Sequence, residues 1–164
     1  MNAAEFDLRL DLAIGAIVKE FASTRPTDRL AGFALCTDDD LSSLNCLLVG
    51  DQDLVAVTGP DLMYMPAEWP FSPKAKTLRF ASRALFQRSE STTDFEAHVD
   101  DSFATLVAAL QRARASGEIA TDVFLVVLST DPSDYLLELQ TRAIERLNGP
   151  EVADGWRAFL ARWT

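Results

Sequence analysis

The sequence feature that most constrains the fold is residues 30–40, LAGFALCTDDD, an apolar run that stops at three consecutive aspartates. An apolar run followed by a polar turn predicts a β-strand that ends at one edge of a sheet. Residues 123–128, VFLVVL, form a second apolar run, which ends in Ser129, Thr130 and Asp131. We therefore predict that the two runs are the inner strands of one sheet and that each delivers carboxylates to an edge.

Three further segments are candidates for strands. Residues 43–49 (SLNCLLV) fit a second strand, and residues 62–65 fit a short edge strand. Residues 54–58 (LVAVT) fit a third, although Asp53 could equally cap a helical turn there. The proline-dense segment 66–73 (PAEWPFSP) fits neither a helix nor an inner strand, and we expect it to lie over the sheet as a loop.

Five segments show the apolar spacing of helices with one buried face. The first covers residues 3–23, and the second starts at Ser72 and Pro73 and runs to about Ser89. The third runs from the capping box of Thr93 and Glu96 to Gly117. The fourth is capped by Asp131 and Pro132 and ends at Asn148, and the last follows Pro150. An aromatic stripe in the last helix indicates core: Val152, Trp156, Phe159, Leu160 and Trp163. The sequence thus predicts one α+β domain over residues 1–164, with a mostly antiparallel sheet of about three to five strands covered by about five helices.

The formal net charge of −10 argues against nucleic acid as a partner, because phosphates require a basic surface. It favours a basic protein partner, or it simply keeps the protein soluble. No apolar run approaches the roughly 20 residues that cross a bilayer. The first residues also lack the pattern of a secretory signal, so we expect a cytoplasmic protein with no membrane partner. The sequence does not indicate an oligomeric state.

The two cysteines, Cys36 and Cys46, fit a compartment in which thiols stay reduced. If the turn between their strands centres near Leu41, the two thiols face each other on one side of the sheet. A disulfide is then geometrically feasible, but buried cysteine more often serves as a small apolar side chain. We expect two reduced thiols.

Clustered carboxylates are the first candidates for chemistry: Asp38, Asp39 and Asp40 follow one inner strand, and Asp131 and Asp134 follow the other. Such oxygen ligands suit magnesium or calcium, but the spacing lacks the central glycine and closing glutamate of a calcium loop. Turn formation and helix capping are sufficient roles, so we predict no metal site. The two acidic ends meet only if their strands run parallel.

Glu68 and His98 are the other candidates for acid–base chemistry. Glu68 lies beside Trp69, where it either acts as a general acid or pairs with an arginine and fastens the loop, which we favour. His98, the sole histidine, has no partner motif and is predicted to lie on the surface. Nucleophile elbows, phosphate loops and dinucleotide fingerprints are missing, so we predict no catalytic residue and no cofactor.

Residues 74–88 form a basic segment without a single acid. At 100° per residue, Lys76, Arg79, Arg83 and Gln87 share one stripe of a helix. We favour a solvated face that docks against the protein's own acids. The alternative is a recognition stripe for an acidic or phosphorylated partner.

Four stretches, FALCTDDDLSS, PAEWPF, VFLVVLSTD and RLNGPEV, resemble a family of bacterial proteins classed as a domain of unknown function. Such proteins show an aromatic-Ala-Leu-x-Thr-Asp-Asp-Asp strand end and a later Ala-Glu-Trp, whereas residues 47–59 depart from the family's pattern. The resemblance implies no established activity and, by analogy, a small immunity or accessory protein.

The sequence therefore predicts a non-enzymatic protein-binding or immunity-like accessory protein with an acidic surface. The alternative is a small enzyme or ligand-binding domain with a carboxylate site at the turn of residues 38–40, near Glu68. The candidate binding residues are Asp38, Asp39, Asp40, Glu68, Trp69, Lys76, Arg79 and Arg83.

Overall fold

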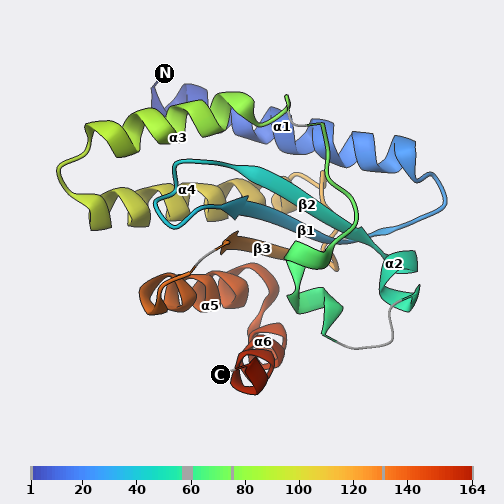
Figure 1. Cartoon of the computed structure of the whole chain (residues 1–164). Coiled ribbons are helices and arrows are strands. Elements are labelled where there is room, and N and C mark those ends of the chain that lie inside the picture. Colours follow the sequence, from blue (N-terminus) through green and yellow to red (C-terminus); the bar gives the residue numbers. More distant parts are fainter. Residues whose placement is uncertain (1, 57–60, 75, 131, 164) are drawn as a thin grey trace.

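A three-stranded sheet with helices on both faces forms the fold (Figure 1). The computed structural model describes residues 2–163 except residues 57–60, 75 and 131. The elements in chain order are α1 (Ala3–Thr24), β1 (Leu30–Thr37), β2 (Asn45–Gly50), α2 (Asp51–Ala56), the 3-10 helices η1 (Leu62–Tyr64) and η2 (Pro66–Glu68), α3 (Arg79–Ser91), α4 (Phe95–Ala115), β3 (Phe124–Ser129), α5 (Asp134–Asn148) and α6 (Pro150–Trp163). None of the described helices has the length and apolar character of a membrane span.

The sheet has the order β2-β1-β3 and is mixed. β1 pairs antiparallel with β2 and parallel with β3. The long connection through α2, α3 and α4 allows the parallel pairing, since such a pair requires a crossover rather than a hairpin. The predictions of an α+β fold and of β1 and β3 as strands are confirmed, with three strands among the described residues.

The sheet separates the core into two clusters. Phe33 and Leu35 of β1 face the larger cluster, which the buried sides of α1, α3 and α4 complete. Ala34 and Cys36 face the smaller cluster, which α6, η1 and Trp69 complete. α5 supplies side chains to both clusters. Because both faces are covered, β1 and β3 read as continuous apolar runs rather than as alternating ones.

The register of β1 and β2 corrects the expected placement of the cysteines. Leu35 pairs with Cys46, and Cys36 pairs with Asn45. The two thiols therefore belong to opposite core clusters and are free and buried. Desolvation raises the pKa of Cys36 to about 12, so that its thiol stays protonated near neutral pH.

The segment between β2 and α3 contains no strand among its described residues, contrary to the prediction. Asp51, Asp53 and Val55 lie in α2, while residues 57 and 58 of the predicted strand lie outside the described residues. Asp53 explains the helix: its Oδ2 accepts a hydrogen bond of 3.0 Å from the amide of Gly50 and pairs with Arg25. The predicted edge strand at residues 62–65 is likewise wrong, because Leu62 to Tyr64 form η1.

Three predicted helix starts are also wrong. α3 starts at Arg79 rather than at Pro73, since an antiparallel bridge between Leu48 and Phe71 holds the preceding chain beside β2. The side chain that caps α4 is Asp94 rather than Thr93. α5 is capped by Ser133, and Asp131 lies outside the described residues.

Candidate functional site

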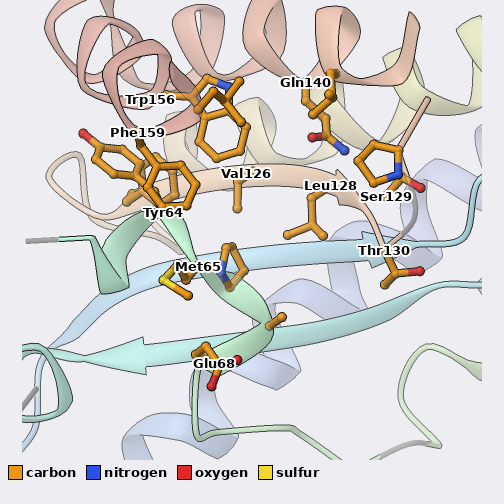
Figure 2. A pocket seen from close by; sticks show the side chains of 16 residues that line it. Tyr64, Met65, Glu68, Val126, Leu128, Ser129, Thr130, Gln140, Trp156 and Phe159 are labelled. Carbon is orange, nitrogen blue, oxygen red and sulfur yellow. The ribbon is translucent and has the colours of Figure 1, made fainter. Parts of the chain in front are cut away.

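A pocket of about 330 Å³ lies between β3, the η1 and η2 segment, α5 and α6 (Figure 2). It lies on the side of the smaller core cluster and reaches the carboxyl end of β3, where Ser129 and Thr130 belong to its lining. Its volume is at the lower end of the range for small-molecule sites, about 300–1,000 Å³. The described residues of the lining are Tyr64, Met65, Pro66, Ala67, Glu68, Phe124, Val126, Leu128, Ser129, Thr130, Pro132, Leu137, Gln140, Trp156, Phe159 and Leu160.

One end of the pocket is an aromatic wall. The ring centroid of Tyr64 lies 6.2 Å from Trp156 and 5.8 Å from Phe159, and the latter two rings stack at 5.6 Å. Trp156 is held in place because its Nε1 donates a hydrogen bond of 3.0 Å to Oγ1 of Thr141. A Cβ on Gly155 would lie 2.1 Å from the Tyr64 hydroxyl oxygen, so only glycine lets Tyr64 approach α6 this closely.

The other end of the pocket carries a buried amide. Gln140 is 2% exposed, and Figure 2 shows its side chain extending from α5 toward Leu128, with Val126 between it and the aromatic wall. Its Nε2 has no hydrogen-bond partner among the described residues. A buried donor without an acceptor costs about 1–3 kcal/mol of stability. The pocket therefore combines largely apolar walls with one hydrogen-bond donor, Nε2 of Gln140, that lacks an acceptor among the described residues.

Glu68 and Trp69 lie on either side of the pocket boundary. Glu68 is exposed, contributes to the lining, and takes part in none of the ion pairs between described residues. Trp69 is 3% exposed and does not line the pocket. Its Nε1 donates a hydrogen bond of 2.9 Å to the Leu62 carbonyl. The centroid of its ring lies 6.2 Å from that of Phe124, a residue that does line the pocket. Trp69 thus supports the pocket indirectly, by packing against the lining residue Phe124.

The aspartates after β1 form a turn outside the pocket lining. Asp38 accepts hydrogen bonds from the Ser42 amide at 2.7 Å, the Ser42 hydroxyl at 2.8 Å and the Ser43 amide at 3.0 Å. Partial burial opposes ionisation of Asp38, but the bonds from Ser43 and Ser42 outweigh it and hold its pKa well below the ordinary value. Asp40 also accepts from the Ser42 amide, whereas Asp39 is exposed.

The parallel pairing brings the two polar strand ends to one edge of the sheet. Thr37 pairs with Ser129, and the Thr130 amide donates a hydrogen bond of 2.9 Å to the Thr37 carbonyl. Asp38 directly follows β1, and Asp134, which follows β3 in the chain, is exposed. Among the described residues, no group of three or more histidines, cysteines, aspartates or glutamates could hold a metal ion.

The basic stripe lies elsewhere. Arg79 and Arg83 line a groove of about 470 Å³ between α3 and α1, together with Gln87 and an ion pair of α1, Arg9 with Glu5 at 2.7 Å. Lys76 is exposed and is not among the residues that line the groove. The eleven ion pairs between described residues include neither of the two arginines.

His98 is buried, at 8% exposure, contrary to the prediction of a surface position. α4 contacts α1, α3, α5 and β3, so that more of its circumference is covered than on a helix with one buried face. Nδ1 of His98 lies 3.5 Å from the Ser102 hydroxyl oxygen.

Sequence reasoning missed Gln140 and the second role of two residues of the aromatic wall. Trp156 and Phe159 are buried, as the apolar spacing predicts, but they also line the pocket. Gln140 has a signal in the sequence: it falls between Leu136 and Ile144 on the buried face of α5, where every other buried residue is apolar. A lone amide on an apolar face indicates either an internal hydrogen bond or a site.

A known protein family matches most of the chain. The family described as a domain of unknown function (DUF4303) matches residues 10–149. The match ends before α6, the helix that supplies Trp156 and Phe159 to the pocket. Searches of curated proteins and of solved structures found no significant match.

Proposed function

The chain belongs to this family of unknown function, and from that premise we propose that it is a non-enzymatic protein that binds a small, largely apolar molecule between β3, α5 and α6. The observation that carries the proposal is the unpartnered Nε2 of Gln140 in a predominantly apolar pocket. An apolar cavity of about 150 Å³ is enough to bind benzene. A pocket of about 330 Å³ therefore accommodates one or two rings.

The lining favours binding over catalysis. Its one described carboxylate, Glu68, is exposed rather than held against a reacting group. Burial and the nearby Asp61 raise the pKa of Tyr64 above its ordinary value, so the phenol stays protonated near neutral pH. The lining thus offers hydrogen bonds and contact area more readily than proton transfer.

Filling the pocket is expected to weaken binding. Naphthalene, a neutral probe, should bind with a Kd of about 0.1–1 mM, as expected for a ligand of about ten heavy atoms. Leu128→Trp places a larger side chain in the pocket, so the Kd should rise at least tenfold. Ligand-observed NMR titration measures this effect, and the thermal midpoint of each variant shows that it folds.

The matched control is Leu12→Trp, the same substitution on α1, where Leu12 is 67% exposed and lies outside this pocket. It should bind naphthalene like the wild type. Equal binding by the folded Leu128→Trp variant, or no binding by the wild type, would contradict the proposed function.

A basic protein partner is the second candidate. Besides the net charge, it is supported by a patch at the starts of α4 and α5, where Glu96, Asp100 and Asp134 are exposed. The Tyr135 hydroxyl donates to Asp100 and joins the two helices, and Phe95, the first residue of α4, is 53% exposed. A partner with clustered lysine or arginine would complement this surface. The two buried free thiols support the cytoplasm as the location.

Charge reversal tests the second candidate. Glu96→Lys should release a basic protein that co-purifies with the wild type from native lysate at low salt. Glu151→Lys, which changes the first-turn glutamate of α6 instead, should retain it. Recovery of the wild-type protein alone at low salt, or equal retention by both variants, would count against a basic partner at this surface.

A further inference from the structure

We infer that the ligand of the pocket is a neutral aromatic carbonyl compound, whose oxygen accepts a hydrogen bond from Nε2 of Gln140 while its ring lies against Tyr64, Trp156 and Phe159. The inference rests on the proposed function and adds the chemical class of the ligand. Three properties of the lining support it: the orientation of the amide, the aromatic wall and the distribution of charge.

The amide selects for an acceptor. Gln140 is almost completely buried, yet its Nε2 finds no acceptor among the described residues. On the side of β3, Val126 and Leu128 project into the same space (Figure 2), and Ser129 and Thr130 line the pocket only at the carboxyl end of the strand. A carbonyl oxygen of a ligand would satisfy this donor, whereas a pure hydrocarbon would leave it unsatisfied.

The aromatic wall selects for a flat group. Its three rings are mutually packed and Trp156 is fixed by Thr141, so they present a rigid surface. Aromatic rings pack favourably against such a surface in offset or edge-to-face arrangements. The amide and the wall lie at opposite ends of one pocket, and this matches a molecule with a ring at one end and a carbonyl group at the other.

The charges exclude an anion. The described lining contains no lysine, arginine or histidine, and its one carboxylate is Glu68. A ligand carboxylate would lose its hydration without gaining a cation and would be repelled by Glu68. A ketone, aldehyde, ester or amide presents the same acceptor without this penalty.

A pair of isosteric probes isolates the hydrogen bond. Acetophenone and α-methylstyrene share the ring and the branched shape, but only acetophenone has an oxygen acceptor. Gln140→Met keeps the length of the side chain and removes the donor. The ratio of the two dissociation constants should shift by about tenfold between wild type and Gln140→Met, in the direction that weakens acetophenone, because one hydrogen bond is lost.

Gln87→Met is the matched control, because Gln87 is exposed on α3 and lines a different groove. It should leave the ratio unchanged. The wild type should also bind benzoate at least tenfold more weakly than acetophenone. Gln140→Met should be at least as stable as the wild type, since it removes an unsatisfied buried donor, and this would separate a ligand-binding role from a structural one.

A direct readout needs no variant. The side-chain amide resonances of Gln140 in the wild type should move on addition of acetophenone and stay nearly in place with α-methylstyrene. If both probes bind and neither the ratio nor these resonances distinguish them, the inferred ligand class is wrong while the proposed function stands. If neither probe nor naphthalene binds, the proposed function fails.

Discussion

Replacing Trp69 by alanine is expected to lower the free energy of unfolding by about 3–5 kcal/mol, the range for deleting a large buried aromatic side chain. Trp69 is 3% exposed and belongs to the smaller core cluster. Its ring packs against Phe124, and its Nε1 donates to the Leu62 carbonyl, which would lose this partner. The substitution removes the support of both η1 and the pocket.

Urea unfolding followed by circular dichroism measures the loss. Val55→Ala is the control, because Val55 is 85% exposed on α2 and its truncation should change stability by less than about 0.5 kcal/mol. Trp69→Phe should fall between the two, since it keeps a ring but loses the hydrogen bond. A Trp69→Ala protein as stable as Val55→Ala would show that the segment between η1 and α3 is not part of the core.

Adding one methyl group at Gly32 is expected to destabilise the protein by about 1–3 kcal/mol, as overpacking does in a filled core. A Cβ on Gly32 would lie 2.6 Å from Cη2 of Trp69 and 2.8 Å from Cγ1 of Val49. Alanine elsewhere in a strand is normally the more stable residue, because glycine loses more backbone entropy on folding. The sign of the effect is therefore diagnostic of the close contact.

The double variant Gly32→Ala with Trp69→Ala tests the cause. When the indole is absent, the methyl group enters the space that it leaves, and the double variant should be more stable than the sum of the two single losses predicts. Urea unfolding of all four proteins gives the coupling. Strict additivity would mean that Gly32 is required for a reason other than Trp69.

The inner strands were predictable because burial on both faces produces an uninterrupted apolar run. Their relative direction was not predictable, since nothing in the sequence around Thr37 or Ser129 indicates that the two residues pair. The parallel arrangement depends on the path of the whole connection between β2 and β3.

The segment after β2 shows why local composition can mislead. LVAVT contains the residues that strands favour, but Asp51 and Asp53 lie in the first turn of α2 and stabilise its start. The bond that the Gly50 amide donates to Asp53 is local, because the two residues are three positions apart. Arg25 pairs with Asp53 and the Gln52 amide donates to Asp28, and these two interactions join positions whose proximity the sequence does not reveal. The predicted caps of α4 and α5 were one and two positions too early, and the predicted start of α3 was six positions too early.

The candidate site was predictable only in part. Regular spacing identified the buried face of α6, but a pocket is the space that packed elements leave unfilled, and no periodic pattern encodes it. Asp38 was correctly expected to form a turn, and its hydrogen bonds with Ser42 and Ser43 are local enough for sequence reasoning. Gln140 can be recognised as a pocket residue only once the packing of β3 and α6 around it is known.

The division of the core by the sheet bears on how a guest molecule would exchange with solvent. The last helix packs on the smaller cluster, whereas the long helices α1 and α4 belong to the larger one on the opposite face. Partial unfolding of a protein follows such independently packed units and costs less than complete unfolding. Local unfolding of α6 would thus remove Trp156 and Phe159 from the aromatic wall and let a guest molecule enter or leave the pocket while the rest of the fold stays intact.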